Sequence, residues 1–144
     1  MNERQAYTAD LAFFRIVSKR YHEFAKKELN EYEFTPNEIA TMIYLMENDD
    51  IDTAKAISDR FHITQSLICR SVDSLTKKGY IKTEIDADDR RVNHLTLHIE
   101  DENLKSILEN LNKRYIDKIF SNMSQEEIDS FHDNLKKIEA MMNS

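Results

Sequence analysis

Apolar residues recur at steps of three and four along the first part of the chain, which is the spacing of one face of an α-helix. From about Tyr7 to Leu29 this seam consists of Tyr7, Leu11, Phe14, Val17, Tyr21 and Phe24. Phe13 and Ile16 add a second apolar flank beside it. The pattern predicts a long helix that packs against more than its own domain.

A second helix is predicted to begin within the sequence FTPNE. Thr35 suits the N-cap, Pro36 suits the first helical position, and Glu38 stands where it completes a capping box. The buried side of this helix is expected to hold Ile39, Met42, Ile43 and Met46.

Two short helical patterns follow, with only two residues between them. Thr53 is the expected N-cap of the first helix, and Thr64 is that of the second. The second pattern stops at Gly79, which suits the position just beyond a helix C-terminus. Two helices joined by so tight a turn form a helix-turn-helix.

Beyond Gly79 the apolar residues alternate with polar ones, which is the period of a strand. The alternating positions are Ile81, Thr83 and Ile85 in a first run and Leu95, Leu97 and Ile99 in a second. Together the two runs predict a β-hairpin whose tip is the sequence DADDRR, residues 86–91.

The last part of the chain is helical again. One stripe contains Leu104, Leu108, Leu111, Tyr115 and Ile119, and a second contains Ile128, Phe131, Leu135, Ile138 and Met142. Ser124 and Glu127 form a capping box before the second stripe. The whole pattern predicts a mainly α protein with about six helices and a two-stranded hairpin.

The composition supports this fold class and excludes several functions. A chain of 144 residues is the size of one domain, and a single glycine and a single proline favour long helices with short loops. One glycine is too few for a phosphate-binding GxxxxGK[ST] or a dinucleotide-binding GxGxxG motif. No nucleophile–base pair, paired catalytic carboxylates or metal cluster can be recognised, so we expect neither an enzyme nor a cofactor.

The sequence also favours a cytoplasmic location. No apolar run approaches the roughly 18 residues that a membrane span needs, and the first residues, MNERQAYTAD, lack an apolar signal core. The one cysteine, Cys69, excludes an internal disulfide and suits a reducing compartment. We therefore expect a cytoplasmic protein with no membrane partner.

Charge is distributed unevenly along the chain. The formal net charge is −7, yet residues 53–97 hold eight Lys and Arg against six Asp and Glu. A mildly basic centre thus lies between two acidic arms.

The helix after Thr64 presents polar side chains opposite its apolar stripe. They are Gln65, Ser66, Cys69, Arg70 and Asp73. Gln can bond bidentately to adenine, Arg to guanine, and Ser to either, so this face suits major-groove recognition. The alternative is that these are the ordinary residues of a solvated helix face.

The hairpin strengthens the nucleic-acid interpretation. An arginine at the tip of such a wing can enter the narrow, negative minor groove next to the recognition helix. Lys77, Lys78 and Lys82 are candidates for phosphate contacts, although solvated lysines have the same pattern.

The segment TAKAISDRFHITQSLICRSVDSLTKKGYIKTEIDADDRRVNHLTL resembles the winged helix-turn-helix of the MarR family of bacterial transcriptional regulators. The resemblance rests on the order of a capped helix, a short turn, a recognition helix ending in KKG and a wing of the type D-x-x-D-R-R. It is close over about 45 residues, and the flanking helices are similar in layout only.

The resemblance implies roles for individual residues. Asp89 matches the aspartate that pairs with an arginine and shapes the wing, Arg91 matches the minor-groove arginine, and Arg90 matches the basic position beside it. Gln65, Ser66 and Arg70 match positions that reach bases or phosphates, and we add Cys69 and Lys82 to the expected DNA-binding set.

The chain departs from the family pattern at three places. His62 stands where the turn usually has a glycine, although histidine tolerates a positive φ better than most residues. Asp88 stands where many members have a neutral or basic residue, which should weaken backbone contacts at the tip. LHIED replaces the usual LTxxG after the second strand.

The resemblance also implies an obligate dimer and a division of the chain. We expect a dimerisation helix over residues 1–34, a winged helix-turn-helix over 35–99 and C-terminal dimerisation helices over 100–144. Within the winged part, the helix-turn-helix covers 53–78 and the wing covers 80–98.

The expected function is that of a repressor. The homodimer would bind a pseudo-palindromic double-stranded operator and be released by a small-molecule or oxidative signal. The alternative is a winged-helix module that binds another protein, or an anti-regulator, and the acidic net charge and Asp88 favour that alternative slightly.

Three further hypotheses concern signals. Phe13, Phe14, Tyr21, Tyr44 and Tyr115 could line a pocket for a small aromatic or lipophilic effector, or could simply be core residues. Cys69 could sense oxidation, or could be a small side chain without that role. His94 and His98 lie about 13 Å apart along a strand, too far to share one metal ion, so no metal site is predicted.

Overall fold

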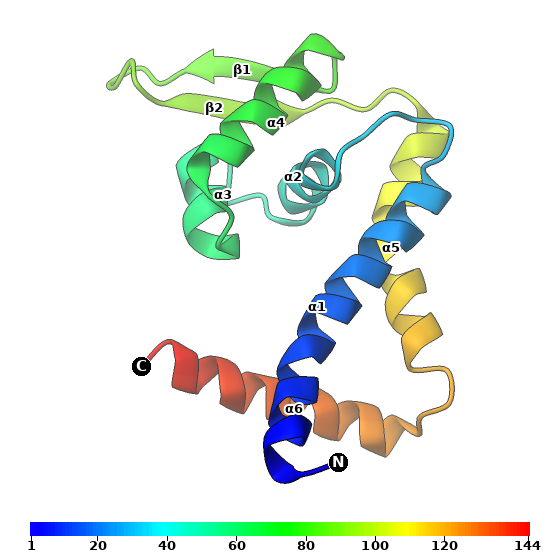
Figure 1. Ribbon diagram of the computed structural model, residues 1–144. Coiled ribbons are helices and arrows are strands. Elements are labelled where there is room, and N and C mark those ends of the chain that lie inside the picture. The colour runs from blue at the N-terminus through cyan, green and yellow to red at the C-terminus, as the bar shows by residue number, and fades with distance from the viewer. The chain divides into compact units, whose positions relative to one another are not determined.

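A computed structural model describes all 144 residues as six helices and one hairpin (Figure 1), which confirms the predicted fold class. In chain order the elements are α1 (Glu3–Glu28), α2 (Pro36–Glu47), α3 (Ala54–Phe61), α4 (Gln65–Lys77), β1 (Ile81–Ile85), β2 (Asn93–Leu97), α5 (Glu102–Ile119) and α6 (Gln125–Met142). The chain divides into two compact units, residues 1–111 and residues 112–144.

The predicted helix starts are largely confirmed by their capping bonds. Thr35 Oγ1 accepts a hydrogen bond from the Glu38 amide at 3.2 Å, and the Glu38 carboxylate accepts one from the Thr35 amide at 3.4 Å. Thr53 caps α3 in the expected way, whereas the Thr64 side chain makes no capping bond to α4. Helix α1 begins earlier than the apolar seam suggested, because Asn2 forms a capping box with Gln5.

Two residues with positive φ terminate the two helices of the helix-turn-helix. His62 follows α3 with φ 57° and ψ 37°, so it adopts the left-handed conformation that glycine most often supplies after a helix. Gly79 follows α4 with φ 86°. The amides of Tyr80 and Gly79 then donate to the carbonyls of Leu75 and Thr76 at 2.9 and 3.1 Å, which is a Schellman ending.

The hydrophobic core of the first unit lies between α2, α3, α4 and the hairpin (Figure 1), and it continues onto the C-terminal end of α1 and the first part of α5 through the buried residues Ala25, Leu29, Leu104, Leu108 and Leu111. Helix α4 contacts α2, α3 and β1, and its residues Ile68 and Leu75 are fully buried together with Met42 and Ile57. The buried stripe fixes the rotation of α4 about its axis, and therefore determines which of its side chains face solvent.

The wing is the antiparallel hairpin that the alternation predicted, but β2 ends at Leu97, so the expected position Ile99 lies beyond the strand. Ile81 lies opposite Leu97 and Thr83 opposite Leu95. Ile81 and Leu95 are buried. The backbone carbonyl of Asp52, in the loop before α3, accepts a hydrogen bond from the Leu95 amide at 2.6 Å. This bond joins β2 to the helix-turn-helix.

Helix α1 leaves the N-terminal half of its apolar seam and the flank beside it in solvent. Among its residues only Ala25 is buried, while Tyr7, Leu11, Phe13, Phe14 and Ile16 are all more than half exposed. In the second unit Phe120 packs edge-to-face against Phe131 at 5.2 Å between ring centroids, yet Ile138, Met141 and Met142 are exposed. A membrane-crossing segment would have to be longer or more apolar than any of the six helices.

Candidate nucleic-acid interface

Helix α4 presents the polar face that its sequence predicted. Gln65, Ser66, Cys69 and Arg70 are exposed, while Ile68 on the opposite side is completely buried. Gln65 and Ser66 belong to the first turn, where a recognition helix contacts base edges. Arg70 takes part in no ion pair within the chain, so its guanidinium is available to a partner.

The lysines near the end of α4 have different surroundings. Lys77 and Lys82 are exposed, and both remain candidates for phosphate contacts. The Lys78 ammonium group instead donates to the Glu33 carbonyl at 2.6 Å and to the Glu38 carboxylate at 2.9 Å. It also lies 5.1 Å from the centre of the Phe34 ring. Lys78 therefore binds within the protein and holds the end of α4 against the start of α2.

Asp86 organises the backbone at the wing tip. Its Oδ2 atom accepts hydrogen bonds from the amides of Asp88 and Asp89 at 3.0 and 2.9 Å. Such a bond pattern closes a tight turn around an aspartate side chain. A hydrogen bond from His94 lowers the pKa of Asp86, and the two amide bonds lower it further.

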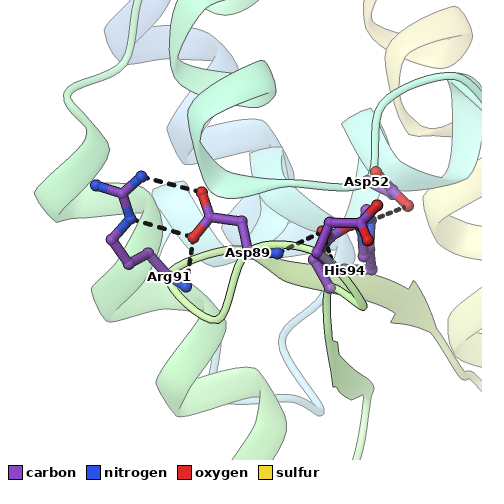
Figure 2. Close-up of polar contacts among 6 residues, drawn as sticks. Asp52, Asp89, Arg91 and His94 are labelled. Atoms are coloured by element: carbon purple, nitrogen blue, oxygen red, sulfur yellow. Dashed lines mark hydrogen bonds and ion pairs between the residues drawn. The ribbon is translucent and has the colours of Figure 1, made fainter.

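Asp89 holds Arg91 in a two-point ion pair (Figure 2). Arg91 Nε donates to Asp89 Oδ1 at 3.1 Å, and Arg91 Nη2 donates to Oδ2 at 3.2 Å. The Arg91 amide adds a third bond to Oδ1 at 3.0 Å. These bonds from Arg91 lower the pKa of Asp89. Because the Arg91 side chain is still 90% exposed, the pair orients the guanidinium without hiding it.

His94 lies between two aspartates, a contact that the sequence did not predict (Figure 2). Its Nδ1 atom is 2.8 Å from Asp52 Oδ2, and its Nε2 atom is 2.7 Å from Asp86 Oδ1. The bonds to Asp86 and then to Asp52 raise the pKa of His94. No local pattern reveals this cluster, because Asp52 stands 42 residues before His94.

The remaining charges of the tip are free of intramolecular partners. Arg90 and Asp88 are exposed, and neither side chain forms an ion pair within the chain. His98, which shares a strand face with His94, lies 3.1 Å from Glu100. No group of three His, Cys, Asp or Glu side chains is arranged to hold a metal ion.

A cleft of about 900 Å³ lies along α1 and the start of α2. Two of the five predicted pocket aromatics, Phe14 and Tyr21, line it, and Phe34 lines it as well. Tyr44 is stacked on Phe61 with 3.7 Å between ring centroids, Phe13 is exposed, and Tyr115 is buried in the second unit.

The basic lining of the cleft was not predicted from the sequence. Arg15, Lys19, His22 and Lys26 line it together with one acid, Glu23. The four basic residues recur at steps of three and four along α1, which places them on one face of the helix. The sequence therefore contains a signal for a basic face here. Burial raises the pKa of Tyr21 to about 12, which keeps this phenol neutral.

Two family models match the sequence. Residues 32–92, which include α2, α3, α4 and most of the wing, match the model of the MarR family. Residues 80–144 match the model of the FliG C-terminal domain. A search of curated proteins found none with significant sequence similarity.

Several solved structures are similar to this chain over most of its length. The Staphylococcus aureus MepR–DNA complex matches with a TM-score of 0.78 and 22% identity, covering 90% of this chain and 96% of that one. FabT from Streptococcus pneumoniae, also in complex with DNA, matches with a TM-score of 0.72 and 21% identity over 95% and 97% of the two chains. A MarR transcriptional regulator from Methanosarcina mazei Go1 matches with a TM-score of 0.79 and 16% identity, covering 90% of this chain and 92% of that one.

Proposed function

We propose that the protein is a transcriptional regulator that binds a specific DNA operator as a homodimer, because residues 32–92 match the model of the MarR family and α3, α4 and the hairpin fold as a winged helix-turn-helix. One observation supports this most directly. Helix α4 has an exposed polar face, and the wing tip holds Arg91 exposed and oriented. Both belong to the first unit, whose core fixes the position of α4 and of the wing. A helix for the major groove and an arginine for the minor groove are the two parts that such recognition needs.

Each exposed residue has a part in this proposal. Gln65, Ser66 and Arg70 contact base edges in the major groove, and Cys69 lies on the same surface. Arg91 enters the adjacent minor groove, while Arg90 and Lys82 contact phosphates. The MepR and FabT structures, both solved with DNA, support this use of the fold.

A second copy of the chain is the natural partner for the exposed apolar residues of α1 and α6. Leu11 is 70% exposed and Ile138 is 50% exposed, which is costly for a monomer in water. A twofold dimer would present two recognition helices to half-sites about one helical turn apart. We therefore infer a pseudo-palindromic operator, and we expect occupancy of it to repress the adjacent genes.

We further propose that the cleft along α1 binds an aromatic or lipophilic effector with a negative charge. Phe14, Tyr21 and Phe34 offer apolar surface, and the lining holds more basic groups than acidic ones. The Phe34 ring also packs edge-to-face against Tyr80, with 5.4 Å between ring centroids, and the Lys78 ammonium group lies over it. A ligand that displaces Phe34 would therefore act on the end of α4 and the start of the wing.

The decisive experiment is selection of genomic DNA fragments by the purified protein, followed by gel-shift titration of the fragments recovered. We expect enrichment of a pseudo-palindrome upstream of the protein's own gene or its neighbours. Arg70→Ala should weaken binding, whereas Arg20→Ala should not, since Arg20 lies on α1 and pairs with Glu23. Indifference to sequence at moderate salt would refute the proposal.

The salt dependence of binding separates this function from the alternative of a protein-binding module, which the net charge of −7 favours. An operator complex releases counterions, so its affinity should fall steeply as salt rises. A module that binds only another protein would recover no DNA in the selection. For the effector, a thermal-shift screen should find stabilisation by aromatic carboxylates that is lost in Lys19→Ala.

A further inference from the structure

We propose that Asp52 and His94 are positioning residues for DNA binding: with Asp86 they form a clamp that fixes the wing to the helix-turn-helix and sets the orientation of Arg91. The proposal rests on the proposed operator binding, because it concerns how the wing is presented to DNA. It concerns residues outside the expected DNA-contacting set, and none of the three needs to touch DNA.

The clamp links the loop before α3 to the wing. No single helix or strand contains residues of both. Asp52 lies immediately before Thr53, the N-cap of α3, while His94 is on β2 and Asp86 begins the wing tip. The two ring nitrogens of His94 lie 2.8 and 2.7 Å from the two carboxylates. The backbone bond between the Asp52 carbonyl and the Leu95 amide, at 2.6 Å, reinforces the same junction.

From Asp86 the polar contacts continue to the guanidinium group. The oxygen of Asp86 that does not meet His94 accepts the amides of Asp88 and Asp89. The Asp89 carboxylate then holds Arg91 at two points (Figure 2). An unbroken series of hydrogen bonds therefore leads from the loop before α3 to the side chain proposed to enter the minor groove.

Both bonds of His94 require the protonated ring. A neutral imidazole has a single N–H, so it can donate to only one carboxylate and turns a lone pair toward the other. The other charged groups around His94 favour protonation on balance. Glu84 lies opposite His94 in the hairpin register, Lys82 lies on the same face opposite Thr96, and Asp50, near Asp52, is paired with Arg60.

The direction of the pH dependence follows from these contacts. The pKa of His94 is raised above 6.5, so the clamp is complete below that pH and is lost as the pH rises through the raised value. The pKa of Asp86 is lowered below 3.8, so its carboxylate stays ionised until strongly acidic pH. Operator affinity should therefore fall on the alkaline side, not on the mildly acidic side.

The first test follows the His94 ring directly, without DNA. An NMR titration of the full-length protein should give a His94 midpoint that drops by about half a pH unit in Asp52→Asn, because an exposed ion pair of this kind is modest. His98→Gln is the matched control, since His98 also meets a carboxylate but is not connected to the tip. An unchanged His94 midpoint in Asp52→Asn would overturn the clamp.

The second test measures operator affinity by fluorescence anisotropy on the selected duplex, from about pH 6 to about pH 9 at constant ionic strength. Wild type and His98→Gln should lose affinity about three- to fivefold over this range. His94→Gln should be weak and nearly independent of pH, while His94→Arg, with a permanent charge and several donors, should be strong and nearly independent of pH.

The outcomes separate the two proposals. If the wild type binds no duplex specifically, the proposed function fails, and the NMR titration still decides whether the clamp exists. If the wild type binds and His94→Gln keeps both its affinity and its pH profile, the positioning role is wrong. Circular dichroism melts of each variant would identify a loss of folding, and Asp52→Asn, which preserves side-chain size, then replaces His94→Gln in the binding series.

Discussion

At the wing tip, residues of the same charge have different tasks because their hydrogen bonds differ. Asp86 closes the turn, Asp89 orients Arg91, and Asp88 is exposed with no partner for its carboxylate. An acidic loop can therefore present a cation to DNA, since two of its three carboxylates are engaged within the protein.

Arg91→Ala should weaken operator binding by more than about tenfold while leaving the fold intact. The Arg91 side chain is 90% exposed, so its removal costs little packing, but it deletes the proposed guanidinium contact in the minor groove. Fluorescence anisotropy would give the affinity, and a thermal melt would give the stability. Arg91→Lys is the matched control. It keeps the charge but not the two-point pairing, and it should fall between wild type and alanine.

Asp88→Ala should bind the operator as well as wild type or better. Only the Asp88 amide is used in the turn, and alanine keeps that amide, while the substitution removes a negative charge beside the phosphates. Asp89→Ala is the comparison, and it should weaken binding because Arg91 loses its two-point partner. Weaker binding by Asp88→Ala in the same titration would mean that the Asp88 carboxylate helps to shape the tip.

At the scale of elements, the helix ends and the hairpin with its tip could be predicted because each depends on neighbouring residues. The capping box of Thr35 and Glu38, the positive φ of His62 and the turn at Gly79 are such local features. The contacts of Lys78 with Glu38 and of His94 with Asp52 span 40 and 42 residues. Periodicity specifies which face of an element is buried, but not which distant loop its polar groups meet, so these contacts had no sequence signal.

Lys78→Met should lower the free energy of unfolding by about 1–2 kcal/mol, because it leaves the Glu38 carboxylate without its charged partner. The Glu38 side chain is only 5% exposed, whereas the Lys78 side chain is 36% exposed, so solvent partly screens the pair. Urea denaturation would measure the change. Lys77→Met is the matched control one residue away, and as an exposed lysine it should change stability by less than about 0.5 kcal/mol. Equal effects of the two substitutions would contradict a structural role for Lys78.

At the scale of the whole molecule, the net charge of −7 does not oppose DNA binding. Five exposed cations lie on α4 and the wing, namely Arg70, Lys77, Lys82, Arg90 and Arg91. The electrostatic potential around α4 and the wing governs the encounter with a polyanion, and the acidic rest of the chain disfavours binding in other orientations. Helix α1 lies outside this DNA-facing surface, and its exposed apolar seam favours the proposed association of two copies.

Leu11→Glu should convert the proposed dimer to monomers. Leu11 lies in the apolar seam of α1 and is 70% exposed, so a carboxylate there costs the single chain little but would be buried on association. Sedimentation equilibrium should show the mass of a single chain. Fluorescence anisotropy should show a lower operator affinity, because one recognition helix reads only a half-site. Thr8→Glu introduces the same charge on the polar face of α1 by helical phase, and should leave both mass and affinity unchanged. A wild type that sediments as a monomer while binding a palindrome tightly would show that the exposed seam of α1 serves another partner.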